Sequence, residues 1–181
     1  MMQNGNIILR YIKDADMEDY VRWTTVETEW FDWDAPWEDD EDEFMEMKKN
    51  SLNKAPHLYS NLEIDTASGQ HIGWVLSYDI DDEGDQVAVG LNIPSVDSRG
   101  KGYGENALTL YMSYLFKEEE RLYTQTWSGN FPMLRLAEKI GFTEVERIKD
   151  LREVKGKKYD ALTFSISKDD FFKKYPELKK D

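Results

Sequence analysis

The stretch Arg99-Gly100-Lys101-Gly102-Tyr103-Gly104 determines how the rest of the chain is interpreted. It follows a strand-like apolar segment, Gln86 to Ile93, and it opens a segment with helical spacing of apolar residues, 102–119. Glycine lets the backbone pass close to a bulky anion, and the free N–H groups at the start of a helix face that anion. The two basic residues of the stretch add positive charge. We therefore expect this turn to bind a pyrophosphate group.

A second motif begins at Asn130 and ends at Gly141-Phe142. The segment before it, Leu122 to Trp127, predicts a strand. Within the motif, apolar residues follow the i, i+3, i+4, i+7 spacing of one helix face, at Met133, Leu136, Ala137 and Ile140. Glycine commonly ends a helix because it adopts the left-handed conformation, so we expect this helix to stop at Gly141.

The first motif alone leaves other functions open. It is not a Walker loop, since Gly-Lys-Ser/Thr is missing, and it is a poor dinucleotide fingerprint because the strands before it look antiparallel. A glycine-rich turn with incidental basic residues is one alternative for this motif taken by itself. A nucleotide-binding domain that uses the same loop is another.

Taken together, the two motifs resemble those of the GNAT N-acetyltransferase superfamily. Arg99 to Gly104 looks like its Arg/Gln-x-x-Gly-x-Gly/Ala signature. Trp127-Ser128-Gly129-Asn130 and Leu136 to Phe142 look like its Asn helix and its Glu-Lys-x-Gly-Phe ending, in the style of the Rim-type branch of ribosomal-protein N-terminal acetyltransferases. The resemblance implies an α/β (α+β) fold and a single acetyl-CoA-binding domain over residues 1–181. Its sheet would be mixed and mostly antiparallel, with two splayed parallel central strands and helices on both faces.

The resemblance also implies where acetyl-CoA binds. The co-substrate would lie in a V-shaped gap between the strands 86–93 and 122–127, and backbone groups at a bulge in the first strand would pair with the pantetheine amides. The diphosphate would lie on the N–H groups of the glycine turn, and an Asn side chain would hydrogen-bond the pantetheine arm. The implied cofactor-binding residues are Leu91, Asn92, Ile93, Arg99, Gly100, Lys101, Gly102, Tyr103, Gly104 and Asn130.

The catalytic residues are indicated less clearly. Many members of the superfamily place a Tyr before the Glu-Lys-x-Gly-Phe segment as a general acid for the departing thiolate, but this chain has Ala137 there. Ser128 and Tyr103 are the candidate acids, although a thiol with a pKa of about 8.5 needs no acid to leave. The first of the two splayed strands contains no carboxylate. The base is therefore expected to be Glu29 or Asp32, or a chain of water molecules.

The segment from Glu27 to Trp37 is unusually rich in carboxylates and indoles. This combination suits a cationic amine, because it offers charge attraction together with cation–π contact. The alternative is that the Trp side chains pack the loop onto the body and that residues 38–43 form the solvated start of a helix. The expected acceptor-binding residues are Glu29, Trp30, Asp32 and Trp33.

The segments before the glycine turn predict strands and helices in the order β-α-α-β-β-β. Residues 58–65, 72–80 and 86–93 predict an antiparallel meander with a turn at 81–84. Residues 6–12 predict an opening strand, and Asp14 or Asp16 is expected to cap the helix that follows. A second helix, with Pro36 in its first turn, would bury Phe44, Met47 and Leu52.

The segments after the second motif predict two strands and a short helix. Residues 142–154 and 159–166 would pair around Lys155-Gly156-Lys157. Ser167 would cap the final helix. Its pair Phe171-Phe172 would either cover the core or help to form a homodimer.

Composition limits the class of protein. A chain of 181 residues with 40% hydrophobic and 13% aromatic content fits one domain with a sizeable core. With 0 Cys there is no disulfide, thiolate metal site or Cys nucleophile, and neither His57 nor His71 has a spacing that suggests a metal. The net charge of −14 disfavours nucleic acid as a partner. No signal peptide and no apolar run of ~18 residues is visible, so we expect a cytoplasmic protein without a membrane partner.

The resemblance and the acidic segment together predict an acetyl-CoA-dependent N-acetyltransferase. It would transfer the acetyl group directly to a primary amine of a polyamine, an aminoglycoside-like molecule or a protein N-terminus. The alternative is a non-catalytic acyl-CoA-binding module, which the missing Tyr and the absent strand carboxylate favour. The cofactor motifs do not identify the acceptor, because the same cofactor site would serve each of these acceptors.

Overall fold

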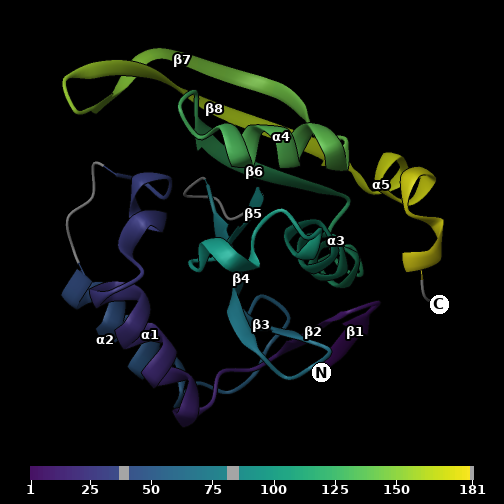
Figure 1. Ribbon diagram of the computed structural model, residues 1–181. Helices are drawn as coiled ribbons and strands as arrows, with labels where there is room; N and C mark the ends of the chain where they lie inside the picture. The colour runs from purple at the N-terminus through teal and green to yellow at the C-terminus, as the bar shows by residue number, and fades with distance from the viewer. Residues whose placement is uncertain (37–40, 81–85, 180–181) are drawn as a thin grey trace.

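The computed structural model describes residues 1–36, 41–80 and 86–179 (Figure 1). The α-helices are α1 (Met17–Thr25), α2 (Glu41–Ser51), α3 (Tyr103–Leu115), α4 (Phe131–Ile140) and α5 (Lys168–Lys174). The strands are β1 (Met2–Asn4), β2 (Ile7–Arg10), β3 (Leu62–Thr66), β4 (His71–Asp79), β5 (Val87–Asn92), β6 (Arg121–Trp127), β7 (Thr143–Val154) and β8 (Lys157–Ser167). Short 3-10 helices are η1 (Asp14–Asp16), η2 (Thr28–Asp32), η3 (Val96–Ser98) and η4 (Pro176–Leu178).

The strands form one eight-stranded sheet in the order β1-β2-β3-β4-β5-β6-β8-β7. Neighbours are antiparallel except β5 and β6, which are parallel. Along β4, Val75 packs into the core with α3, whereas Trp74 and Leu76 pack into a second cluster with α1. Helices therefore cover both faces of the sheet, as Figure 1 shows. The expected mixed sheet with a central parallel pair is confirmed.

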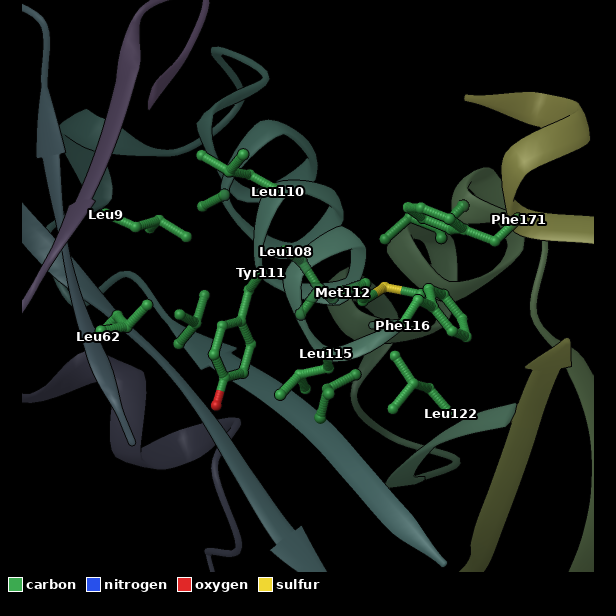
Figure 2. Close-up of a cluster of buried hydrophobic side chains, with 14 of the residues drawn as sticks. Leu9, Leu62, Leu108, Leu110, Tyr111, Met112, Leu115, Phe116, Leu122 and Phe171 are labelled. Atoms are coloured by element: carbon green, nitrogen blue, oxygen red, sulfur yellow. The ribbon is translucent and has the colours of Figure 1, made fainter. Parts of the chain in front are cut away.

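The larger core lies under α3 (Figure 2). The helical spacing expected over 102–119 gives α3 an apolar face, which is fully buried and includes Ala107, Leu108, Tyr111 and Leu115. At the C-terminal end, the Ser167 side chain accepts a hydrogen bond from the N–H of Asp170 and so caps α5, as expected. Phe171 of α5 is fully buried, and its ring centroid lies 5.0 Å from that of Phe116. Phe171 was expected either to cover the core or to help form a homodimer, and in the structure it covers the core.

Several elements in the first half differ from the sequence expectations. The chain forms an additional short strand, β1, and β3 begins at Leu62, because the preceding residues 58–59 form a turn. Pro36 lies in a turn and α2 begins at Glu41. Trp37, residues 38–40 and the expected turn at 81–84 lie outside the described residues. Within the described part of the chain, no helix is long and apolar enough to cross a membrane.

A second, aromatic cluster lies on the opposite face of the sheet from α3. Tyr20, Trp23, Trp30 and Trp74 are its buried members. The indole N–H of Trp30 donates to the carbonyl of Trp23 over 2.9 Å, and the Trp30 ring lies edge-on to Trp74 with centroids 5.4 Å apart. Trp30 therefore packs the acidic segment onto the body, in line with the alternative interpretation of that segment.

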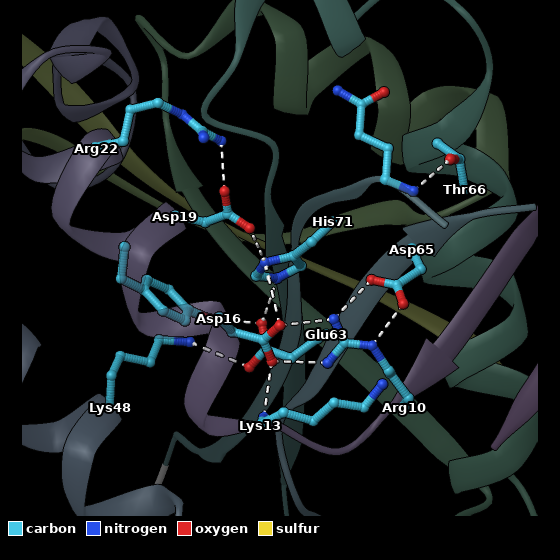
Figure 3. Close-up of polar contacts among 12 residues, drawn as sticks. Arg10, Lys13, Asp16, Asp19, Arg22, Lys48, Glu63, Asp65, Thr66 and His71 are labelled. Carbon is cyan, nitrogen blue, oxygen red and sulfur yellow. Dashed lines mark hydrogen bonds and ion pairs between the residues drawn. The ribbon is translucent and has the colours of Figure 1, made fainter. Parts of the chain in front are cut away.

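An ionic cluster is buried beside the aromatic one (Figure 3). Arg10 of β2 donates to both carboxylate oxygens of Asp16, each over 2.7 Å, and also to Asp65 of β3. Asp16 precedes α1 but does not cap it, contrary to expectation, because its carboxylate accepts these bonds and one from the N–H of Lys13. The cluster thereby ties the entry of α1 to the sheet.

His71 lies at the centre of this ionic cluster. Its Nδ1 is 2.9 Å from Asp19 and its Nε2 is 3.0 Å from Glu63. Burial by itself lowers the pKa of His71, but the hydrogen bond to Glu63 and the charges of Glu63 and Asp16 outweigh it and raise the pKa above its usual value. The hydrogen bonds to Asp19 and Glu63 give His71 a structural role, and the raised pKa favours the charged form of its imidazole.

The buried side of α2 agrees with the prediction at Phe44, which packs against the aromatic cluster, and differs from it at the other two positions. Met47 is 43% exposed and Leu52 lies beyond the end of the helix, whereas Lys48 is 1% exposed. The Lys48 Nζ lies 4.2 Å from the ring centroid of Trp74 and 4.5 Å from that of Tyr20. It is 4.0 Å from Glu63. Burial lowers the pKa of Lys48 to about 8, although the charge of Glu63 opposes this shift.

We expect Lys48→Met to raise the free energy of unfolding by about 1–3 kcal/mol near pH 7, because an apolar side chain removes the cost of burying a charge. Glu63 keeps Tyr20 and His71 as hydrogen-bond partners in this variant. The folded protein releases the Lys48 proton near pH 8 and the unfolded chain near 10.5, so wild-type stability gains with rising pH between these values. The advantage of the variant should therefore disappear above that range.

Urea unfolding at a series of pH values measures this difference. Lys49→Met, at the exposed next position of α2, is the matched control and should show no comparable gain. A Lys48→Met protein that is less stable than wild type at neutral pH would show that the charge contributes net stability through its aromatic neighbours.

Candidate active site

A cavity of about 820 Å³ lies between β5 and β6. The two strands register at Ala88 and Tyr123, near the start of each, and residues from their later halves, 89–93 and 124–127, line the cavity. The strands therefore separate toward their C-terminal ends, as expected for the V-shaped gap. The pairing of β4 with β5 runs in one register from Trp74 opposite Asn92 to Asp79 opposite Val87, so the expected bulge in the first splayed strand is not formed there.

The glycine turn forms one end of this cavity. Gly102 is the N-cap of α3 with φ +81°, Gly100 has φ +71°, and both line the cavity together with Gly104. A Cβ added at Gly100 or Gly102 would meet nothing within 4 Å, so the backbone borders open space. The first N–H groups of α3 have no side-chain cap, and uncapped N–H groups at the start of a helix can bind an anion. Of the other two residues of the turn, Lys101 is exposed and Tyr103 packs against the core.

Arg99 lines the cavity together with Gly100, and its guanidinium has protein partners there. Its guanidinium donates to the carbonyl oxygens of Ile93 and Pro94, each over 2.8 Å, and pairs with Glu29. These bonds hold the end of β5 against the acidic segment. Further positive charge on the cavity wall comes from Arg135 and Lys139 of α4. Lys139 pairs with Glu105 of α3 over 2.6 Å, so Arg135 is the basic residue that the sequence reasoning missed.

Asn130 lies at the other side of the gap, where α4 begins. Its Oδ1 accepts the N–H of Met133 over 3.1 Å and caps the helix, while its Nδ2 donates to the carbonyl oxygen of Trp33 over 3.1 Å. The indole N–H of Trp127 donates to the same carbonyl over 3.0 Å. The predicted cofactor residue Asn130 and the predicted acceptor residue Trp33 are therefore in direct contact, and both line the cavity.

Two hydroxyl groups on β6 indicate that the cavity suits a polar ligand. Thr124 and Thr126 line it, and their Oγ1 atoms are buried with no hydrogen-bond partner among the described residues. Buried hydroxyls are normally hydrogen-bonded, so these atoms favour a ligand with its own donors and acceptors between the strands. Together with the lining residues Leu91, Asn92 and Ile93 on the facing strand, they fit the amide-bearing arm of a coenzyme A ester.

The expected catalytic residues lie away from the centre of the cavity. Glu29 is held by Arg99 and by the indole N–H of Trp33, which donates to it over 2.7 Å. Asp32 pairs with Lys155 at the tip of the β7–β8 hairpin over 2.9 Å. The Ser128 hydroxyl accepts the N–H of Asp160 over 3.0 Å and joins β6 to β8. Each of these three side chains therefore forms an ion pair or a hydrogen bond with another part of the protein.

The carboxylate that does line the cavity from the acidic segment is Asp34. Its Oδ2 accepts a hydrogen bond from the Nδ2 of Asn92 over 2.9 Å, which places it at the end of β5. Tyr78 of β4 also lines the cavity, and its hydroxyl donates to Gln125 over 3.3 Å. Burial, with a smaller contribution from the charge of Asp34, raises the pKa of Tyr78 to about 12, so the phenol stays protonated at neutral pH.

Sequence reasoning included Asp34 in the acidic segment but did not select it. The alternation of β4 would have placed Tyr78 on the same face as Trp74 and Leu76, so this residue could have been found from the strand pattern. Glu146 of β7 lines the cavity as well and carried no local signal. Its role depends on a strand pairing that the sequence does not specify.

Comparison with known proteins agrees with this geometry. A family model described as an acetyltransferase (GNAT) domain matches residues 6–143. The chain is 29% identical over 75 residues to a Bacillus subtilis protein described as the SPbeta prophage-derived uncharacterized N-acetyltransferase YokL. That alignment covers 40% of this chain and 42% of the relative, so it spans less than half of either protein.

Solved structures with the same fold cover nearly the whole chain. Spermidine N-acetyltransferase from Vibrio cholerae, in complex with CoA and spermine, has a TM-score of 0.74 at 17% identity and covers 93% of this chain and 99% of its own. RimL, a ribosomal L7/L12 alpha-N-protein acetyltransferase in complex with CoA, has a TM-score of 0.72 at 13% identity and covers 91% and 95%. At these identities the similarities establish the fold.

Proposed function

The chain belongs to the acetyltransferase (GNAT) family, and we propose that it transfers the acetyl group of acetyl-CoA directly to a primary amine of a small cationic molecule or a protein N-terminus. One observation carries this proposal. A single cavity connects the glycine turn of α3 with the carboxylate of Asp34. An anion-binding end and a cation-binding end thus share one space between two separated strands.

The cofactor half supports binding of the diphosphate and the pantetheine arm. The free N–H groups at the start of α3, from Gly102 to Gly104, would hold the diphosphate, with the guanidinium of Arg135 on the same wall. The backbone of β5 at Leu91 to Ile93 and the hydroxyls of Thr124 and Thr126 would pair with the amides of the arm. Bound acetyl-CoA supplies an activated acetyl thioester, and these residues orient it.

The acceptor half supports binding of an ammonium group. We propose that Asp34, rather than Glu29 or Asp32, binds the acceptor nitrogen and receives its proton before attack. The Asn92 amide holds one Asp34 oxygen, so the carboxylate has a fixed orientation at the end of β5. Tyr78 is a neutral hydrogen-bond donor nearby and does not compete for the proton. Trp30 and Trp33 line the same half and add aromatic surface for a cation.

Two acceptor classes fit this half. Two solved structures with the same fold are named as enzymes that act on these classes, one on a polyamine and the other on a ribosomal-protein N-terminus. An α-amino group has a pKa of about 8 and loses its proton readily, whereas an alkylamine has a higher pKa and depends more on a carboxylate. The aromatic and acidic acceptor half favours an alkylamine. The N-terminus of a protein is retained as the second acceptor class for the test.

Calorimetric titration of the purified protein with acetyl-CoA, with ATP as the control, tests the proposal first. We expect saturable binding in the micromolar range for acetyl-CoA and none for ATP. Acetylated product, detected by mass spectrometry after incubation with a panel of amines and peptides, then tests turnover. Binding without any product would favour a non-catalytic acyl-CoA-binding module, and absence of binding would show that the cavity has been misinterpreted.

A further inference from the structure

A row of hydrogen bonds joins side chains from four strands, β4, β6, β8 and β7, on the acceptor side of the cavity. The hydroxyl of Tyr78 donates to the Oε1 of Gln125 over 3.3 Å, and the Nε2 of Gln125 donates to the Oγ1 of Thr163 over 3.5 Å. The Thr163 hydroxyl donates to the Oε2 of Glu146 over 3.4 Å. All four residues line the cavity. We call these four residues the polar row.

The register of the sheet explains why the polar row forms. Gln125 of β6 lies opposite Thr163 of β8, and Thr163 lies opposite Glu146 of β7. Directly opposed residues point to the same face of a sheet, so the three side chains follow one line across the strands. Every hydrogen bond in the row donates in the same direction, and the row ends at a carboxylate. Thr163 is buried, so the row fixes one oxygen of Glu146 and leaves the other for a ligand.

Among the described residues, no basic side chain forms an ion pair with Glu146, and the ion pairs of its neighbour on β7 involve other carboxylates. Arg147, next to it in the chain, pairs with Glu144 and Asp160. Arg152 also lines the cavity, but it lies opposite Tyr159, four residues along β8 from Thr163, so its backbone is roughly 13 Å from that of Glu146. Glu146 therefore presents negative charge at the edge of the acceptor half.

Glu146 and Asp34 are held at opposite sides of this half. Asp34 contacts Asn92 at the end of β5, and β6 and β8 lie between β5 and β7 in the sheet. Three strand spacings of about 4.8 Å give roughly 14 Å, and the opening between β5 and β6 adds to this value, so the strands that hold the two carboxylates are about 14 Å or more apart. A compact monoamine cannot reach both. A linear molecule with a cationic nitrogen at each end can.

Resting on the proposed acetyl transfer, we propose that Glu146 is a specificity-determining residue that binds a second cationic nitrogen of a linear acceptor, while the reacting nitrogen lies at Asp34. The polar row positions the Glu146 carboxylate, and the lining side chains Ile148 and Leu151 provide apolar surface along β7 for the connecting chain. The acceptor is thereby identified by its chemistry as a diamine or polyamine, not a monoamine.

The test compares linear α,ω-diamines of increasing length with n-alkylamines of the same chain lengths. Binding to the protein saturated with CoA is measured by calorimetry, and turnover with acetyl-CoA is measured in parallel. For wild type we expect the longer diamines to bind at least about tenfold more tightly than the matched monoamines, as for a charged hydrogen bond. Glu146→Gln should remove this preference and leave monoamine binding unchanged.

Glu144→Gln is the matched control, because Glu144 lies on the same strand and pairs with Arg147 at the surface. It should retain the preference for diamines. The inference is overturned if wild type binds matched monoamines and diamines equally, or if Glu146→Gln weakens both by the same factor. Because the binding arm needs no chemistry, it decides the role of Glu146 even if no amine is acetylated. Failure of the proposed function would appear separately, as absence of acetyl-CoA binding or of product.

Discussion

Gly102→Val should abolish acetyl-CoA binding, with a loss of affinity of more than about 100-fold in calorimetric titration. Gly102 is the N-cap of α3, and a Cβ at this position would point into open space at the cavity wall, where a diphosphate would approach the N–H groups. A branched side chain would fill that space. It would also strain the left-handed backbone at φ +81°, at a cost of about 1–2 kcal/mol in folding stability.

Gly69→Val separates these two effects. Gly69 has φ +85°, has open space around its Cβ and lies in the turn between β3 and β4, away from the cavity. This variant should lose a similar amount of stability while binding acetyl-CoA as the wild type does. Normal binding by a folded Gly102→Val protein would show that the glycine turn is not the diphosphate site.

Asp34→Asn should lower kcat/KM for the amine acceptor by about 100- to 1,000-fold, because it removes the group proposed to bind the ammonium and receive its proton. The amide has the same shape and can keep a hydrogen bond to Asn92, so the fold and acetyl-CoA binding should be unchanged. Initial rates at several pH values measure the effect. The loss should be smaller at high pH, where more of the amine is already deprotonated in solution.

Asp32→Asn is the comparison that distinguishes the two carboxylates. Asp32 pairs with Lys155 outside the cavity at an exposed position, so we expect at most a small change in rate and stability. If Asp32→Asn reduces the rate as strongly as Asp34→Asn, the acidic segment must take a different arrangement during turnover. If neither has an effect, proton removal depends on water or on another group.

The glycine turn and the helix that starts at Asn130 could be predicted because their signals are local. Gly102 and Gly141 both adopt the left-handed conformation, and Asn130 caps α4 with its own side chain. These properties depend on neighbours within a few residues, so spacing alone reveals them. The alternation of β4 and the apolar face of α3 are local in the same sense. The fold class followed from these signals together with the family resemblance.

The acidic segment shows where sequence reasoning fails. Three of its carboxylates lie within six residues, and the short 3-10 helix η2 gives them no periodicity from which a face can be assigned. Their roles are decided by partners far away in the chain. Glu29 pairs with a residue 70 positions away, Asp32 with one 123 away, and Asp34 with one 58 away. Two of these partners, Arg99 and Asn92, line the cavity, but of the three carboxylates only Asp34 lines it.

In the core, the position of Lys48 also depends on residues that are distant in the chain. Helical spacing places position 48 on the same face as Phe44, yet Met47 and Leu52 were expected to be buried there because they are apolar. Lys48 is buried instead, because aromatic rings from α1 and β4 surround its ammonium. Helical period identifies apolar faces but does not detect a charge that its distant neighbours can accommodate.

The sequence by itself determined the order of most elements, the glycine turn at the start of α3 and the likeness to an acyl-CoA enzyme, since each depends on residues close together in the chain. The tertiary structure alone decided that Arg99 holds the acidic segment and that Asp34 and Glu146 share one cavity. The physical reason is that carboxylates of equal intrinsic chemistry acquire different roles from burial and from their ion-pair partners. Strand pairing and loop packing determine the burial and the ion-pair partners, and they join residues too far apart in the chain for a local sequence pattern to reveal.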